Sequence, residues 1–317
     1  GHTAPLTTEI RGRGNSTWTL SPKKPYTLKL NKKASLLGMP ATKKWVLLAN
    51  YGDKTMLRTA AAFCMARILD MPYTPDSEFV ELSVNGVPQG LYQLTNKTYK
   101  VSEKIKEDKK QAADESDPAQ LDDPFLLEVH WFLERDLHFQ SSTVIPLQFR
   151  SEPDDDEFHR IVDWFNQFES IMTQTDDEQR LDKIKQQMDI RSLIDMLLVN
   201  ELIGNHDAFL FSTHLFKLKG GLLTWGPAWD FDQSSGLTEP TFETDAWMLP
   251  FRTPPYNAPL WYFETLLKHP EFADLLQERW QHLHQHVPAL RWVLHEFAKT
   301  LNDAQQRNFE IWPILGE

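Results

Sequence analysis

Residues 225–236 read WGPAWDFDQSSG, and two acids, Asp230 and Asp232, stand on either side of Phe231. Successive side chains of an extended chain point to opposite sides. We therefore expect both carboxylates to face a cavity and Phe231 to point into the core. Two carboxylates this close repel each other unless a cation neutralises them. Mg²⁺ prefers one or two carboxylates with phosphate oxygens and water, so the pair is a candidate metal site. A loop with solvated charges is the alternative.

The composition indicates a folded protein with a sizeable core. Of 317 residues, 41% are hydrophobic and 12% aromatic, which is incompatible with a disordered chain. The net charge is −12, whereas nucleic-acid binding proteins usually carry a basic excess, so no nucleic-acid partner is expected. No run of ~18 apolar residues occurs, so no membrane span is expected either.

Residues 1–100 are expected to be rich in β-strands. The segments TTEIRG (7–12) and PYTLKLN (25–31) alternate apolar and polar residues, as half-buried strands do. Asn85-Gly86 separates two further candidate strands and predicts a tight hairpin. Between them, KTMLRTAAAFCMARIL (54–69) has the apolar spacing of a helix.

The rest of the chain is expected to be mainly helical. Residues 101–123 are highly charged and form either an exposed helix or a loose insertion, which we expect to be mobile. Residues 124–317 contain several helical patterns and one hairpin pattern around Gly220-Gly221, just before the two acids. The sequence thus predicts an α+β fold, with a β-rich lobe, a helix-rich lobe and the acids at their junction.

A glycine loop at residues 10–18, IRGRGNSTW, is a candidate phosphate site. Gly14 frees the backbone to approach a ligand, while Arg11 and Arg13 provide planar donors suited to phosphate. Asn15 adds a further donor. An ordinary β-turn is the alternative interpretation.

Two lysines that follow this loop, Lys24 and Lys29, are candidates for holding nucleotide phosphates, as a strand lysine does in phosphoryl transfer. Lysines that protect an edge strand from aggregation are the alternative. Asp207, in the segment NHDAF (205–209), follows a buried helical pattern and could accept a proton from a substrate hydroxyl. A simple turn is the alternative there.

Six segments occur together in this order: RGRGNSTW, PKKPYTLKL, KWVLLANYGDKTMLRTA, GLYQL, NHDAF and GPAWDFDQSSG. The set resembles the spore-coat CotH kinase family over residues 7–240, and the helical tail also fits. The resemblance implies one divergent protein-kinase-like domain of two lobes. It also implies ATP-dependent phosphorylation of Ser or Thr on secreted or surface proteins, with Mg²⁺ or Mn²⁺. An extracytoplasmic or cell-surface location and a monomeric state are expected, although no signal peptide is visible in this sequence.

By position, Asp207 matches the catalytic aspartate of that family and Asp230 its metal-binding aspartate. Many members carry Asn where Ser212 stands here, and a hydroxyl is a weaker metal ligand, which puts a second metal ion in doubt. Members also often show Glu after the GLYQLT strand, where this sequence has Asn96. Residues 54–69 contain no acid to pair with a strand lysine, so Glu81 or Glu128 would have to supply one. These departures leave a second function open: a surface binding or structural module that has kept the fold and lost the activity.

Overall fold

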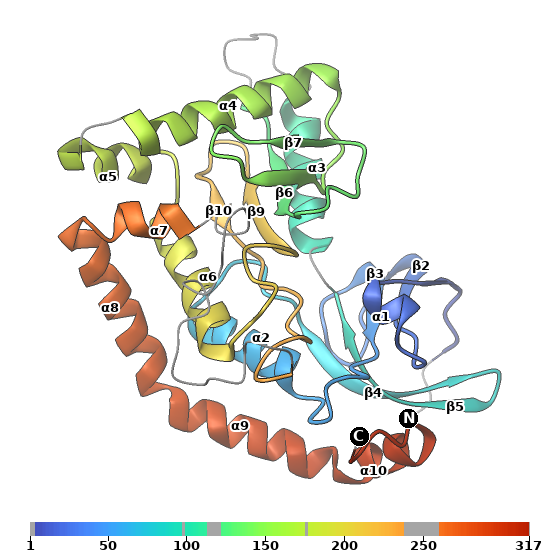
Figure 1. Ribbon diagram of the computed structural model, residues 1–317. Helices are drawn as coiled ribbons and strands as arrows, with labels where there is room; N and C mark the ends of the chain where they lie inside the picture. Colours follow the sequence, from blue (N-terminus) through green and yellow to red (C-terminus); the bar gives the residue numbers. More distant parts are fainter. Residues whose placement is uncertain (1–3, 97–98, 113–121, 175–176, 238–259, 317) are drawn as a thin grey trace.

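The computed structural model describes residues 4–96, 99–112, 122–174, 177–237 and 260–316. Two antiparallel five-stranded sheets lie apart in space, with helices packed around the second (Figure 1). The predicted α+β class, with a β-rich beginning and a helix-rich remainder, is confirmed.

The first sheet has the strand order β1-β2-β3-β5-β4. Its strands are β1 (Thr8–Gly12), β2 (Tyr26–Ala34), β3 (Thr42–Leu48), β4 (Ser77–Val84) and β5 (Val87–Thr95). The predicted hairpin at Asn85-Gly86 joins β4 to β5, and φ is +52° and +80° at these two residues. Positive φ at both central positions is what a two-residue hairpin turn needs. Helix α1 (Ser16–Thr19) follows β1, and α2 (Arg58–Ile68) connects β3 to β4.

The second sheet has the order β10-β9-β6-β8-β7. Its strands are β6 (Phe125–Val129), β7 (His138–Gln140), β8 (Pro146–Phe149), β9 (Thr213–Lys217) and β10 (Thr224–Trp225). Strand β6 ends at Val129, because the chain turns at His130, whose carbonyl accepts a hydrogen bond from the Leu133 amide at 3.1 Å.

The remaining helices follow along the chain and lie on different parts of the molecule (Figure 1). They are α3 (Tyr99–Ala112), α4 (Asp155–Gln174), α5 (Asp177–Lys185), α6 (Ile190–Ile203), α7 (Leu260–Leu266), α8 (Pro270–Gln285), α9 (Val287–Thr300) and α10 (Asn302–Ile311). Most residues of α6 are buried, so this helix forms the centre of the main apolar core. Among the described segments, none is a helix long and apolar enough to cross a membrane.

The charged segment predicted at 101–123 is in part a packed helix. Val101 and Ile105 of α3 are fully buried and contact Leu126 and Phe216 of the second sheet. The remainder of the segment, residues 113–121, lies outside the described residues.

The C-terminal helix α10 packs against the first sheet rather than the second (Figure 1). Asn308 Oδ1 accepts hydrogen bonds from the Leu91 amide at 3.0 Å and from Lys23 Nζ at 2.8 Å. Lys23 also donates to the Leu91 carbonyl and is completely buried. Burial lowers the pKa of Lys23 to about 7. The first sheet is therefore supported by residues from the far end of the chain.

Candidate active site

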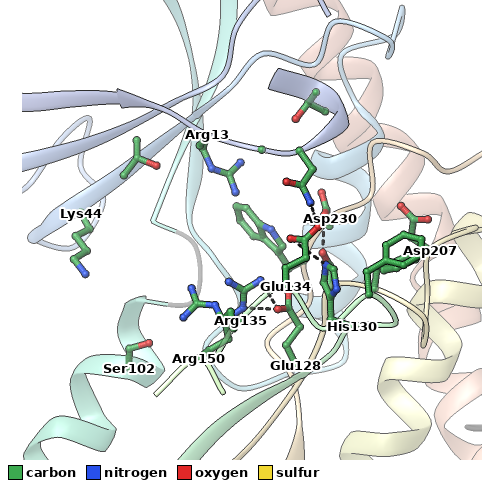
Figure 2. Close-up of a pocket in the computed structure, with 18 of the residues that line it drawn as sticks. Arg13, Lys44, Ser102, Glu128, His130, Glu134, Arg135, Arg150, Asp207 and Asp230 are labelled. Atoms are coloured by element: carbon green, nitrogen blue, oxygen red, sulfur yellow. Dashed lines mark hydrogen bonds and ion pairs between the residues drawn. The ribbon is translucent and has the colours of Figure 1, made fainter. Parts of the chain in front are cut away.

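A cavity of about 1170 Å³ is lined by residues from both halves of the chain. Most of the predicted site residues belong to its lining: Arg11, Arg13, Gly14, Asn15, Asp207, Ser212, Asp230 and Asp232. Figure 2 shows Arg13 reaching in from the first sheet, with Asp207 and Asp230 on one side.

The glycine loop is a tight turn whose shape depends on both glycines. A Cβ at Gly12 would come within 2.3 Å of the Trp18 ring, and one at Gly14 within 2.1 Å of Thr17 Oγ1. Gly14 also has a φ of +84°, which favours glycine. The packing of Trp18 is therefore a sufficient reason for Gly12, independent of any ligand.

Arg13 is held over an aromatic ring at the edge of the cavity. Its guanidinium carbon lies 5.5 Å from the centroid of the Trp229 ring, and its amide donates to the Pro25 carbonyl at 3.2 Å. A guanidinium that lies over a ring is held in a defined orientation.

The segment that carries Asp207 begins where α6 ends. Gly204 adopts the left-handed conformation, with a φ of +61°, and turns the chain away from the helix axis. The side chain of Asn205 then connects two parts of the site. Its Oδ1 accepts from the Asp207 amide at 3.2 Å, and its Nδ2 donates to the Asp230 carbonyl at 3.3 Å.

Phe231 points into the core while both acids line the cavity, but the chain is not extended there, because φ is +69° at Asp230. Phe231 is 1% exposed and packs edge-on against Phe63 of α2 at a centroid distance of 6.5 Å. Asp230 and Asp232 both line the cavity. Burial, together with the charges of Asp230 and Asp207, raises the pKa of Asp232 to about 7. The negative charge at this place is thus only partly compensated.

Ser212 contacts Asp230 directly. Its hydroxyl donates to Asp230 Oδ2 at 2.8 Å. Both residues have positive φ, +52° at Ser212 and +69° at Asp230, and Phe209 nearby has +59°. Positive φ also occurs at non-glycine residues outside the cavity, such as Leu37 and Asp70, so these angles define the local turns and do not by themselves mark a function.

The donor set fits a cation that takes part of its coordination from a substrate. Among the described residues, no compact group of three or more His, Cys, Asp or Glu side chains forms a complete metal cage. Two carboxylates with residual negative charge, Asp230 and Asp232, remain as ligands. Mg²⁺ is commonly bound in this way, with phosphate oxygens and water completing its shell.

The two predicted strand lysines lie elsewhere. Lys24 Nζ donates to the Trp18 carbonyl at 2.6 Å, and Lys29 Nζ lies 3.4 Å from Glu9 Oε2 on the exposed edge of the sheet. Neither belongs to the described lining of the cavity. Lys44, which pairs with Lys29 across β2 and β3, does line it.

Several basic lining residues carry no sequence motif that marks them. Lys44, Arg135 and Arg150 lie on the side of the cavity away from Asp207 (Figure 2). Burial and the charges of neighbouring cations, Lys106 first among them, lower the pKa of Lys44. Lys44 follows the strand alternation of β3 and could have been selected on that basis. Arg135 and Arg150 come from a turn and a strand end that only the folded chain brings together.

The acids considered as lysine partners are already paired with arginines. Glu128 is 1% exposed, lines the cavity and forms an ion pair with Arg150. Glu81 accepts two hydrogen bonds from Arg307 of α10, at 2.7 and 2.8 Å. Neither acid has an ion pair with a lysine among the described contacts.

The model of the family described as CotH kinase protein matches residues 10–316. The chain belongs to this family. The match covers nearly the whole chain, so this CotH kinase family member has a kinase-like α+β fold, as the six ordered segments indicate. A search of curated proteins found no match.

Within the CotH family member, the Asp207 turn and the Asp230–Asp232 segment flank one cavity under the first sheet. Membership of this family indicates a kinase-like protein.

Proposed function

We propose that the protein transfers the γ-phosphoryl group of ATP to a serine or threonine hydroxyl of a protein, with Mg²⁺ or Mn²⁺. The observation that carries this proposal is the presence of Asp207, Asp230 and Asp232 in one cavity, with Arg13 entering from the first sheet. Phosphoryl transfer depends mainly on positioning and charge neutralisation, which such a mixture of carboxylates and cations can supply.

Asp230 and Asp232 would hold the divalent cation, which when bound neutralises charge on the phosphate oxygens. Arg13 would donate to phosphate oxygens from its fixed position over Trp229. Asn15 and the Gly14 backbone, which line the same part of the cavity, would add weaker donors. Ser212 would keep Asp230 oriented through its 2.8 Å hydrogen bond.

Asp207 would orient the acceptor hydroxyl and take its proton. As that proton leaves, the hydroxyl oxygen forms a bond to the γ-phosphorus. The bond from the γ-phosphorus to the bridging oxygen of ADP breaks, and ADP leaves with the electron pair. The amide of Asp207 is fixed by Asn205, so the carboxylate is presented on a constrained turn.

The test is transfer of label from γ-labelled ATP, in the presence of Mg²⁺, to casein-like acceptors and to the protein itself. Label on serine or threonine that disappears in Asp207→Asn is the expected result. Label that persists unchanged in Asp207→Asn would exclude Asp207 from the reaction. An α-labelled ATP control shows that phosphoryl rather than nucleotidyl groups are transferred.

A second candidate is a surface binding or structural module that has lost activity. It is favoured by Ser212, which stands where many family members carry Asn, and by the absence of acids in the α2 sequence RTAAAFCMARI. A thermal-shift titration separates the two. ATP with Mg²⁺ at 100 times the dissociation constant stabilises a protein by about 2.7 kcal/mol. No shift with any nucleotide would favour the binding module.

An extracytoplasmic or surface location and a protein acceptor belong to the same proposal. They are supported by the spore-coat association of the CotH family. We expect a monomer, which sedimentation of the purified protein would test.

A further inference from the structure

The first residue of helix α2, Arg58, has its guanidinium fixed by a buried acid. Asp53 is 2% exposed and accepts hydrogen bonds from the amides of Arg58 at 2.9 Å and Thr55 at 3.0 Å. The same carboxylate forms an ion pair with the Arg58 guanidinium. The start of α2 and the direction of the Arg58 side chain are therefore set together.

The other donors of this guanidinium reach the segment that carries the metal-binding acids. Arg58 Nε donates to the Ser234 carbonyl at 2.8 Å, and Nη2 donates to the Ser235 carbonyl at 3.2 Å. These carbonyls follow Asp232 by two and three residues. A planar guanidinium can serve a carboxylate and two carbonyls at once, which an ammonium group cannot do in the same geometry.

Helix α2 also holds the other end of this segment. Phe63, completely buried, stacks against Trp229 at 6.1 Å and receives the edge of Phe231 at 6.5 Å. The residues that flank Asp230 and Asp232 are thus attached to α2 at both ends, by rings on one side and by Arg58 on the other.

The same segment is connected to the Asp207 side of the cavity. The Ser235 amide donates to the Ile203 carbonyl at the end of α6, at 2.8 Å. The Ser234 hydroxyl donates to the Phe231 carbonyl at 2.6 Å, which closes the turn after Asp232. Any shift of Arg58 would therefore be passed to the turn that contains Asp232.

We propose that Arg58 is a positioning residue for the metal-binding carboxylates, and that α2 sets the geometry of the Asp230–Asp232 pair through it. In typical kinases the corresponding connection runs through a helix glutamate and a strand lysine, but α2 contains no acid. Here the helix reaches the carboxylate segment directly. The inference rests on the proposed function in one respect, that Asp230 and Asp232 take a divalent cation.

The test compares two arginines of the same helix. Arg67 also donates a hydrogen bond to a backbone carbonyl, that of Pro75, at 2.6 Å. Neither Arg67 nor Pro75 belongs to the described lining of the cavity. Mn²⁺ alone is titrated into wild type, Arg58→Lys and Arg67→Lys, and binding is followed by water proton relaxation. Outer-shell substitutions typically weaken metal binding by about 10- to 100-fold. We expect that loss for Arg58→Lys and less than about a twofold change for Arg67→Lys.

Thermal unfolding and hydrogen exchange show whether the variants fold. We expect faster exchange in residues 229–235 of Arg58→Lys, with α6 unchanged. Equal Mn²⁺ affinity in Arg58→Lys and wild type would overturn this inference and leave the proposed function standing. Equal losses in both variants would show a general destabilisation and would also overturn it. If wild type itself binds no Mn²⁺, the proposed metal site fails, and the inference fails with it.

Discussion

Asn15 Nδ2 donates a hydrogen bond to Glu134 Oε1 at 2.5 Å and so joins the glycine loop to the second half of the molecule. Glu134 lies in the turn after β6, and His130 at the start of that turn is 3.7 Å from Glu134 Oε2. The amide of Trp131 in the same turn donates to the Leu210 carbonyl, beside Asp207, at 3.0 Å. Through these contacts, the loop proposed to bind phosphate is connected to the turn that contains Asp207 and Leu210.

Removing the Asn15–Glu134 hydrogen bond should increase the rate at which nucleotide dissociates. A hydrogen bond to a charged group contributes about 1.5–3 kcal/mol, and an exposed one less. We expect Glu134→Ala to release a fluorescent ATP analogue about fivefold faster, in line with ~1 kcal/mol. Glu134→Gln, which keeps an acceptor oxygen, should have a smaller effect. Identical release rates in all three proteins would show that the bond does not restrain the loop.

Asp230 and Asp207 should differ in what their substitution removes. Asp230→Asn takes charge from the proposed metal site and should weaken metal-dependent ATP binding as well as abolish turnover. Asp207→Asn leaves that site intact and should keep ATP and Mg²⁺ binding while losing phosphoryl transfer. Calorimetric titration beside a labelled transfer assay measures both properties. The reverse pattern would exchange the two roles.

Lys44 and Lys29 offer a matched pair across two strands. They are register partners on β3 and β2, but only Lys44 lines the cavity, whereas Lys29 is 3.4 Å from Glu9. A charged contact to phosphate contributes about 1.5–3 kcal/mol. Lys44→Met should therefore weaken ATP binding about tenfold, and Lys29→Met should leave it unchanged. A loss in Lys29→Met alone would support the assignment made from the sequence.

The raised pKa of Asp232, about 7 against an ordinary 3.8, predicts two pH effects. A cation must displace the proton, so Mn²⁺ affinity should rise between pH 5 and 7 and level off above. In the cation-free protein the folded state binds this proton more tightly than the unfolded state. Folding stability should therefore fall as pH rises from about 4 to 7.

The substitution Asp232→Asn should remove this pH-dependent loss of folding stability, because the amide does not titrate. With EDTA present, the variant should melt higher than wild type at pH 8, and by a smaller margin at pH 5, where the wild-type group is still protonated. Differential scanning calorimetry at both pH values measures the difference. A margin that does not change with pH would show that Asp232 titrates normally.

Local sequence patterns predicted the parts of the fold that local patterns control. The Asn85-Gly86 hairpin follows from turn chemistry. The order acid, aromatic, acid predicts a buried Phe231 between two acids that line the cavity, but the backbone there has a φ of +69° at Asp230 and is not a strand. The helix at residues 58–68 was recognisable from its apolar spacing. These features need only short stretches of chain to determine them.

Local sequence patterns could not predict the environment of residues whose partners lie far away in the chain. Lys23 and Lys24 are adjacent, yet one is fully buried against α10 and the other reaches Trp18. Nothing in the segment distinguishes them, because the partner of Lys23, Asn308, lies 285 residues away. Arg150 likewise enters the cavity only because β8 pairs with β6 and brings it to Glu128.

The attachment of α10 to Lys23 and Leu91 also has a consequence for synthesis of the protein. The strands of the first sheet leave the ribosome well before Asn308, which lies 285 residues after Lys23. A nascent chain therefore cannot complete the buried contacts of Lys23 until α10 has been synthesised.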